Sequence, residues 1–230
     1  MNDYVGTELG LFQHATNWKT YYGRMIAPYL GQEVLEVGAG LGANTAWLCR
    51  PAQQRFTCLE PDTNLARQIQ AKISSGALPT CCKVIVGTLD SLAPRNQFDS
   101  LVYIDVLEHI ENDHAEARKA LTALRPGGHL VVLSPAHPFL FSPFDASIGH
   151  YRRYSRASLG ALVADRPLLL RYLDSFGMCL SLANRLCLRQ KMPSLQQIQF
   201  WDKWVIPISR LMDPLLGYRV GKSVLGVWKK

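Results

Sequence analysis

The stretch VLEVGAGLGANT (residues 34–45) decides the fold. An apolar run leads into three alternating glycines, and a helical pattern follows from Ala43. This order predicts a strand, a tight turn and a helix whose first backbone N–H groups face a ligand. Gly38 and Gly40 lack a Cβ, which allows a sharp turn and a close ligand, and Gly42 lets the helix pack on the strand. The glycines alone do not say which nucleotide binds, because Ala43 also completes a dinucleotide pattern.

Two acidic residues narrow the choice of nucleotide. Glu36 stands just before the glycines, where a carboxylate could hold the cationic amine of an amino-acid-bearing ligand. Glu60 ends the next apolar run, residues 56–60, and lies twenty positions after Gly40. Carboxylates at about that spacing hydrogen-bond ribose hydroxyls in doubly wound folds. An adenosine that carries an amino acid satisfies both observations.

Through VLEVGAGLG (34–42) and CLEPD (58–62) the chain resembles the class I S-adenosylmethionine-dependent methyltransferases, of the small-molecule type called methyltransferase-11 or -12. The resemblance covers about residues 8–160 well and the remainder loosely. It implies an α/β fold: a Rossmann-like, doubly wound, seven-stranded, mostly parallel sheet, with S-adenosyl-L-methionine as cofactor. We expect a single domain over residues 1–230, with an N-terminal helix and a helical insertion before the last strand.

Composition fits a cytoplasmic globular protein. The chain has 230 residues, of which 48% are hydrophobic and 19% charged, enough for one well-cored domain. The polar start of the chain does not read as a secretory leader, and apolar runs are too short or too interrupted to span a bilayer. The six cysteines follow no metal-ligand spacing, so we expect reduced thiols and no metal.

The basic charge belongs to the C-terminal part. Residues 1–135 carry 11 Lys/Arg and 13 Asp/Glu, a net of −2, whereas residues 136–230 carry 14 and 5, a net of +9. Such asymmetry fits an acidic substrate or an anionic surface, or simply a solvated basic face. Nucleic acid is not expected as substrate, because no recognised module is present and SPAH (134–137) stands where base-modifying relatives carry an N-P-P-Y-type signature.

The resemblance assigns further cofactor contacts. Residues 8–30 form a helical lid over the cofactor, with Trp18 or a tyrosine against the sulfonium, and Tyr22 is also a catalytic candidate. A cation beside an aromatic face gains about 0.5–2 kcal/mol. Such aromatics could instead only fix the helix to the sheet. After the third strand, the positions that match the adenine contacts are Thr88, Leu89 and Asp90, of which Asp90 could instead cap a short helix.

The stretch DVLEHI (105–110) resembles the fourth motif of small-molecule methyltransferases. Asp105 is expected at the carboxyl end of the fourth strand, where open α/β sheets bind ligands. His109 could serve as a general base near neutral pH. The same Glu-His pair occurs in many such enzymes whatever their substrate. His109 could therefore equally serve only to support the loop.

Residues 136–160 are predicted to form the substrate loop, because GHYRRYS (149–155) is too aromatic for a plain connection. His150 is a second base candidate. The predicted substrate contacts, which would clamp an anion or shape the pocket, are Phe139, Tyr151, Arg152 and Arg153. The alternative is an ordered loop held to the body by Arg–carboxylate pairs.

Residues 177–216 are predicted to be a helical insertion between the last two strands. Pro207 and Pro214 interrupt it, which favours a lid or a subunit contact over a helix lying on a membrane. Monomer and homodimer both remain open.

Three functions follow. The first is methyl transfer to a small, acidic metabolite or a natural-product or envelope precursor. The second is intramolecular cyclisation of S-adenosylmethionine to azetidine-2-carboxylate and methylthioadenosine. The third is a non-catalytic adenosyl-binding partner.

Overall fold

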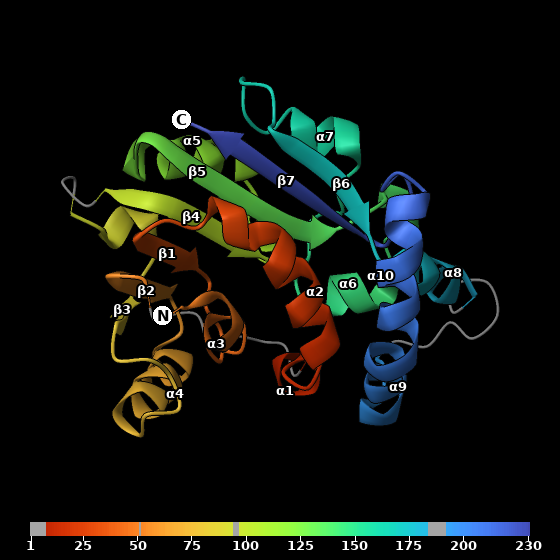
Figure 1. Ribbon diagram of the computed structural model, residues 1–230, viewed down its shortest axis with the longest axis horizontal. Helices are drawn as coiled ribbons and strands as arrows, with labels where there is room; N and C mark the ends of the chain where they lie inside the picture. The colour runs from red at the N-terminus through yellow and green to blue at the C-terminus, as the bar shows by residue number, and fades with distance from the viewer. Residues whose placement is uncertain (1–7, 51, 94–96, 184–191) are drawn as a thin grey trace.

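The computed structural model describes residues 8–50, 52–93, 97–183 and 192–230. Its centre is a seven-stranded sheet in the order β3-β2-β1-β4-β5-β7-β6 (Figure 1). The strands are β1 Glu33–Val37, β2 Arg55–Glu60, β3 Cys82–Val86, β4 Phe98–Ile104, β5 Leu124–Pro135, β6 Leu169–Leu173 and β7 Ser223–Lys229. The first five strands pair in parallel, and β7 is antiparallel to both β5 and β6. The predicted fold class is confirmed.

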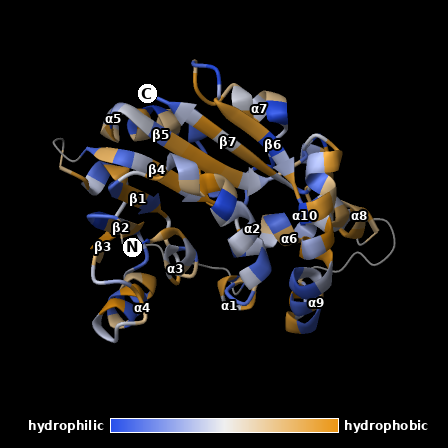
Figure 2. Cartoon of the chain, viewed as in Figure 1, coloured by the Kyte–Doolittle hydropathy of each residue, from blue (hydrophilic) through white to orange (hydrophobic). Residues whose placement is uncertain are grey.

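Helices cover both faces of the sheet. The α-helices in the described residues are α1 Glu8–Phe12, α2 Thr16–Ile26, α3 Thr45–Leu48, α4 Thr63–Ser74, α5 Asp113–Ala123, α6 Pro143–Ser147, α7 Arg156–Gly160, α8 Ser175–Ala183, α9 Leu195–Phe200 and α10 Ile206–Leu215. One face packs against α2, α3, α4 and α10, and the other against α5 and α7. Apolar residues run along the central strands (Figure 2), as expected of a parallel sheet covered on both faces.

Two local features of the chain are notable. The helix after the glycine turn has only four residues, Thr45–Leu48. The LRPGG stretch (124–128) forms the start of β5, with a register shift opposite Phe98 and Ser100. Gly128 explains this continuation, because a Cβ there would lie 3.0 Å from the Asp99 carbonyl oxygen. A Cβ at that distance would require the neighbouring backbone to shift, which glycine avoids.

The predicted insertion lies between β6 and β7 and is anchored by buried aspartates. Asp174 accepts hydrogen bonds from Trp201 Nε1 (2.8 Å) and Ser209 Oγ (2.6 Å). Asp213 accepts from Tyr21 Oη at 2.7 Å. A π-helical turn, Trp201–Val205, joins α9 to α10. The insertion is therefore a packed part of the domain, gathered with α1, α2 and α6 at one end of the sheet (Figure 1).

Three cysteines lie together in the structure, although their spacing in the sequence does not indicate a cluster. Cys49 Sγ is 3.3 Å from Cys81 Sγ and 3.4 Å from Cys82 Sγ, because α3 ends where β3 begins. Cys187, Arg185 and Arg189 of the insertion lie outside the described residues. In the ranges that the structure describes, no helix combines the length and the apolar character needed to cross a membrane.

Candidate active site

The glycine turn has the backbone that its sequence predicts. Gly38, Gly40 and Gly42 have φ of 67°, 57° and 69°, a left-handed conformation that favours glycine. A Cβ at Gly38 would lie 2.7 Å from Val106 Cγ2, so the turn also packs closely on the β4 loop. The backbone N–H of Gly40 donates to Glu60 Oε2 at 2.7 Å.

Glu60 ends β2 and faces the glycine turn. Its other oxygen, Oε1, accepts the backbone N–H of Asp62 at 2.9 Å. Burial raises the pKa of Glu60, and the two N–H donors oppose that shift. Each carboxylate oxygen can accept more than one hydrogen bond, so Glu60 can organise the turn and still receive ribose hydroxyls.

Glu36 lies beneath the turn and is buried. The Thr45 hydroxyl donates to Glu36 Oε2 at 2.5 Å, while Oε1 has no hydrogen-bond partner among the described residues. Burial raises the pKa of Glu36 to about 8. A cationic ligand amine near Oε1 would favour ionisation and supply the absent partner.

The predicted adenine contacts follow β3. Thr88, not Asp90, caps the one-turn helix Leu89–Ser91, so the alternative role of Asp90 as its cap is corrected. Asp90 instead pairs with Lys119 at 2.7 Å on the surface. Leu89 is buried in the core beneath this corner.

The N-terminal helix brings its aromatic side chains to the site. Trp18 and Tyr22 are edge-to-face, with ring centroids 5.3 Å apart, and both line the cavity described below. Tyr22 Oη donates to Asn44 Oδ1 at 2.8 Å, and burial raises the pKa of Tyr22 well above its usual range. Lys19 also lines the cavity, and burial lowers its pKa to about 8.

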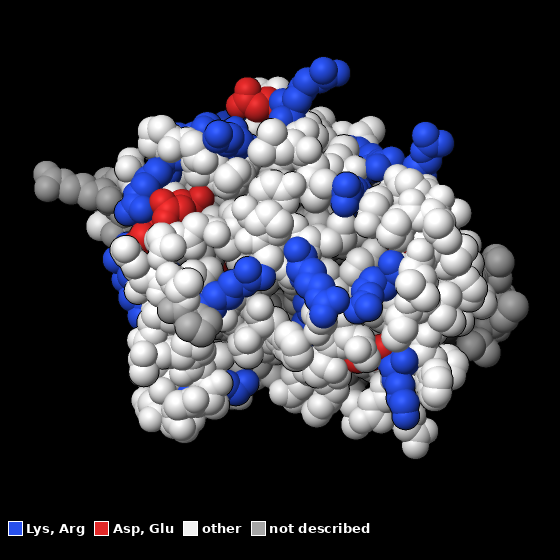
Figure 3. Space-filling view, in the orientation of Figure 1, with Lys and Arg blue, Asp and Glu red and all other residues white. Residues whose placement is uncertain are grey.

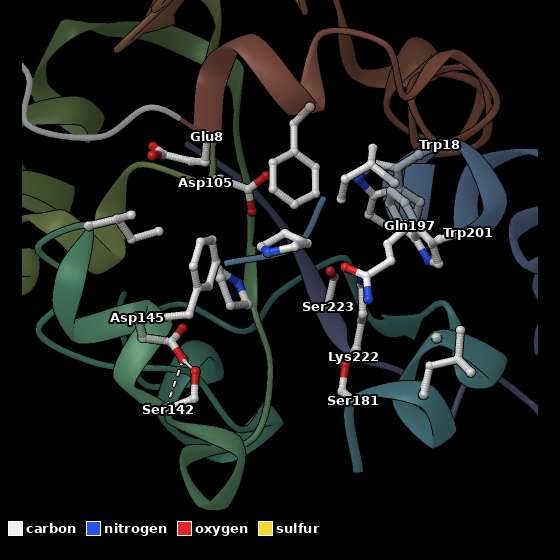
Figure 4. A pocket seen from close by; sticks show the side chains of 18 of the residues that line it. Glu8, Trp18, Asp105, Ser142, Asp145, Ser181, Gln197, Trp201, Lys222 and Ser223 are labelled. Carbon is white, nitrogen blue, oxygen red and sulfur yellow. Dashed lines mark hydrogen bonds between the residues drawn. The ribbon is translucent and has the colours of Figure 1, made fainter. Parts of the chain in front are cut away.

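The cavity has a volume of about 1130 Å³ and lies between α1–α2, the end of β4, residues 140–153 and the insertion. Figure 4 shows Asp105, Asp145, Trp201 and Lys222 around the same space. Apolar side chains make up much of its wall, among them Leu9, Phe12, Trp18, Leu140, Phe144 and Ile198. Lys222 lies 3.9 Å from the centroid of the Trp201 ring and 3.7 Å from Asp174 Oδ2.

Asp105 stands at the carboxyl end of β4, as predicted, and faces the cavity. Its φ of 53° is unusual for a residue other than glycine, and such strained backbone is concentrated at functional sites. The side chain is open to the cavity, and the protein that encloses it raises the pKa of Asp105 to about 6, although His150 and the lysines nearby oppose the shift.

His109 and His150, predicted as separate base candidates, form a pair. Their ring centroids are 4.4 Å apart at an interplanar angle of 83°. Burial lowers the pKa of His109 to about 4, and the neighbouring His150 acts in the same direction. His150 Nδ1 lies 3.0 Å from Asp145 Oδ1. Glu108, next to His109, is fully buried, and burial raises its pKa well above the usual range.

The substrate loop is held by its arginines. Arg153 donates two hydrogen bonds to Asp145, from Nε to Oδ1 at 2.8 Å and from Nη2 to Oδ2 at 2.9 Å, and it lines the cavity. Arg152 instead pairs with Asp113 at 2.7 Å. Tyr151 and Phe139 are more than half exposed and do not line the cavity. The alternative of a loop fixed by Arg–carboxylate pairs is therefore what the structure contains.

Sequence reasoning missed several residues of the cavity wall. Asn44 belongs to the glycine stretch and Lys19 to the predicted N-terminal helix, but neither was predicted to line a site. Lys222 and Trp201 carried no local signal, because only tertiary packing brings β7 and the insertion to the end of β4.

The chain is similar to known methyltransferases. A family described as "Methyltransferase domain" matches residues 35–132. A demethylmenaquinone methyltransferase of Tropheryma whipplei is 27% identical over 172 residues, covering 70% of this chain and 65% of its own. The ubiquinone/menaquinone biosynthesis C-methyltransferase UbiE of Yersinia pestis is 25% identical over 159 residues, covering 68% and 63%. The chain thus spans about 65% of the length of the first of these relatives.

Solved structures share the fold. Coclaurine N-methyltransferase, bound to N-methylheliamine and S-adenosylhomocysteine, superposes with a TM-score of 0.64 at 14% identity, over 94% of this chain and 72% of the other. The sheet order, the glycine turn and the matched domain are those of class I S-adenosylmethionine-dependent methyltransferases. Together with the relatives, they support this class for the chain and S-adenosyl-L-methionine as its cofactor. The predicted class and cofactor agree with these findings.

Proposed function

We propose that this protein transfers the methyl group of S-adenosylmethionine to a small-molecule acceptor held in the cavity. The observation that carries the proposal is the cavity itself, whose volume of about 1130 Å³ exceeds the roughly 300–1,000 Å³ of most ligand pockets. It reaches Tyr22, Asn44 and Asp105 on the cofactor side and extends beneath the insertion. An acceptor would lie in this space next to the methyl-bearing end of the cofactor, while Glu60 and the glycine turn, which would hold the adenosine, lie outside the cavity wall.

The residues divide the work of an in-line displacement. Glu60 and the glycine turn hold the adenosine, Glu36 and Asp105 lie toward the amino-acid end, and Trp18 shields the sulfonium. The new acceptor–carbon bond forms as the sulfur–carbon bond breaks, so alignment and exclusion of water supply most of the rate. The N-terminal helix and the insertion close over the reactants and provide that exclusion.

An acceptor that is neutral at pH 7 must also lose a proton. His150 is oriented for this, because Asp145 holds its Nδ1 and leaves Nε2 toward His109 and Glu108. Tyr22 is less suited as a base, because its raised pKa keeps the phenol protonated. His150 is therefore our candidate for the proton-accepting group, and Tyr22 a cofactor-side contact.

The cavity wall favours an apolar acceptor that carries an acidic or hydroxyl group. Aromatic and aliphatic side chains supply most of the surface, while Lys19 and Lys222 offer positive charge. Two relatives are named for quinone methylation. We accordingly propose a hydroxylated aromatic acceptor with an apolar substituent, a narrower class than the acidic metabolite that the sequence predicts.

A panel of acceptors tests this proposal. Purified protein and S-adenosylmethionine are incubated with dihydroxyaromatic compounds bearing short isoprenoid chains, and in parallel with small polar amines. We expect S-adenosylhomocysteine to form with the first group only. Turnover with polar amines alone would contradict the acceptor class.

The two other functions have less support. The cyclisation of S-adenosylmethionine would be favoured by a site without room for an acceptor, and the cavity is larger than that. A non-catalytic role would be favoured by a damaged glycine turn or by loss of Glu60, and both are intact.

Location and partners remain part of the proposal. The five cysteines in the described ranges are free thiols, which suits the cytoplasm. On the face shown in Figure 3, Lys and Arg side chains are dispersed rather than gathered into one stripe. This supports a small-molecule substrate over nucleic acid. Exposed apolar side chains on and beside α10, such as Trp204 and Leu211, keep a subunit contact open and leave monomer and homodimer as alternatives.

A further inference from the structure

Three potential metal ligands meet beside the cavity. Glu108 and His109 come from the turn Leu107–His109 after β4, and His150 comes from the segment after α6. One ligand atom of each lies within 4.8 Å of the other two. A backbone hydrogen bond from Tyr151 N to Glu108 O (2.8 Å) fixes the two segments against each other.

We propose that Glu108, His109 and His150 bind a divalent first-row transition ion such as Mn²⁺, Fe²⁺ or Zn²⁺. Two imidazoles and one carboxylate form a ligand set typical of such ions, and the set leaves coordination positions open. This goes against the sequence-based expectation of no metal, because the third ligand stands about forty residues away in the chain.

The surroundings of both histidines suit metal ligation. The Asp145 carboxylate accepts hydrogen bonds from Arg153 Nε (2.8 Å), Arg153 Nη2 (2.9 Å) and Ser142 Oγ (2.7 Å), and its Oδ1 lies 3.0 Å from His150 Nδ1. His150 Nδ1 therefore carries the proton, and the lone pair of Nε2 is directed to the side of Glu108. His109 hydrogen-bonds to the backbone at Ile148 and Gly149. Ligating histidines almost always have such a second partner, which fixes the ring.

Glu108 supplies an independent observation. It is fully buried, and neither of its carboxyl oxygens has a hydrogen-bond partner of normal geometry within the described part of the chain, although Ser134 lies close. A buried carboxyl group without partners is unfavourable and calls for an explanation. A bound cation beside Glu108 provides one.

The spacing is close to that of a bound ion. His150 Nε2 lies 3.9 Å from Glu108 Oε1. Ligand atoms at about 2.1 Å from one ion are about 3–3.4 Å apart in octahedral or tetrahedral geometry. This pair would close around an ion with a contraction of less than about 1 Å, and the three ligands, which lie within 4.8 Å of one another, with one of less than about 2 Å.

The site faces the proposed reaction. His109, His150 and the strained Asp105 line the same cavity, so an open position on the ion would face the acceptor. A divalent ion lowers the pKa of a bound hydroxyl group and would prepare an acceptor oxygen. In the ion-bound protein this would take the place of proton removal by His150, because a ligated Nε2 has no lone pair left to accept a proton. This catalytic use rests on the proposed methyl transfer, whereas ion binding does not.

The test measures ion binding without cofactor or acceptor. The full chain is stripped with a chelator, dialysed and titrated with Mn²⁺, and free Mn²⁺ is followed by electron paramagnetic resonance. We expect one ion per chain, at least tenfold weaker binding in Glu108→Gln and in His150→Ala, and no change in His114→Ala, which alters an exposed histidine. Zn²⁺ should displace Mn²⁺, as the usual affinity order requires.

Either of two results would overturn the site: no binding of Mn²⁺ or Zn²⁺ at millimolar concentration, or unchanged binding in both variants. Should a variant not fold, electron spin-echo spectra of Mn²⁺ on the unmodified protein decide, because two imidazole ligands give nitrogen modulation and their absence rejects the assignment. Full methyl transfer by the stripped protein would overturn only the catalytic use, and failure of methyl transfer would leave ion binding intact.

Discussion

The Asp202 carboxylate accepts the backbone N–H of Trp18 at 2.9 Å, although the two residues lie 184 positions apart. The neighbouring N–H of Asn17 donates to the other oxygen at 3.0 Å. Asp202 thus caps α2, whose own N-cap residue Ala15 offers no side-chain acceptor. The insertion thereby fixes the helix that carries Trp18 and Tyr22, and with the hydrogen bond from Tyr21 to Asp213 this contact joins two walls of the cavity.

Replacement of Asp202 by asparagine should weaken the contact between α2 and the insertion. The asparagine presents an N–H₂ group to a backbone N–H where the aspartate presents an oxygen, so at least one buried donor loses its partner. We expect the free energy of unfolding to fall by about 1–3 kcal/mol, measured by urea denaturation. Asp165→Asn, at an exposed position, is the matched control. Equal stability of Asp202→Asn and the control would show that the insertion docks by other contacts.

Replacement of Glu60 by alanine should weaken cofactor binding. The variant removes the acceptor for the Gly40 N–H and the expected partner of the ribose hydroxyls. We expect S-adenosylmethionine to bind more weakly by about 1–3 kcal/mol, measured by calorimetry, with a smaller loss in Glu60→Gln, which keeps one acceptor oxygen. Unchanged affinity in the alanine variant would remove Glu60 from the ribose role.

Stability should depend on the protonation of Glu36. Its pKa in the folded protein is about 8, above the ordinary value of 4.5 that it has when unfolded. Between these values the folded state holds a proton that the unfolded state has lost, so stability decreases as the pH rises. The slope is up to about 1.4 kcal/mol for each pH unit.

The variant Glu36→Gln should remove this part of the pH dependence. Glutamine keeps an acceptor for the Thr45 hydroxyl but does not titrate. Denaturation midpoints at pH 5 and pH 8, without cofactor, should show the variant gaining on the unmodified protein at the higher pH. A constant difference across this range would mean that Glu36 is ionised in the fold.

Tyr22→Phe separates binding from catalysis. The change removes the hydroxyl that donates to Asn44 and leaves the aromatic ring beside Trp18. We expect cofactor affinity to fall by about 0.5–1.5 kcal/mol while the turnover number at saturating cofactor stays within about threefold. A large loss of turnover at unchanged affinity would restore Tyr22 as a catalytic residue.

The sequence predicted what local pattern determines. The strands that begin near Val34, Phe56 and Phe98 are apolar runs in the sequence. The three glycines indicate the tight turn, because glycine favours its left-handed backbone conformation. Asp62, a residue type favoured at helix N-caps, stands directly before α4 and accepts the N–H groups of Asn64 and Leu65. Signals of this kind need only neighbours in the chain.

Partners distant in the chain could not be predicted in the same way. Three contacts depend on how loops pack in three dimensions. Arg153 pairs with Asp145, Asp202 caps α2, and His150 lies beside Glu108. Two adjacent arginines give no hint that one lines the cavity while the other pairs with Asp113 on the outside. The substrate contacts at Tyr151 and Phe139 therefore stay predictions without support from the cavity wall.

The central claim is that the cofactor gives its methyl group to a second molecule in the cavity. The most direct measurement uses S-adenosylmethionine with an isotopically labelled methyl group, incubated with the protein alone and with a hydroxyaromatic acceptor, and follows the label by mass spectrometry. We predict a stable cofactor when the protein is alone, and labelled acceptor with S-adenosylhomocysteine when both are present. Labelled methylthioadenosine formed without any acceptor would contradict the account and establish the cyclising reaction.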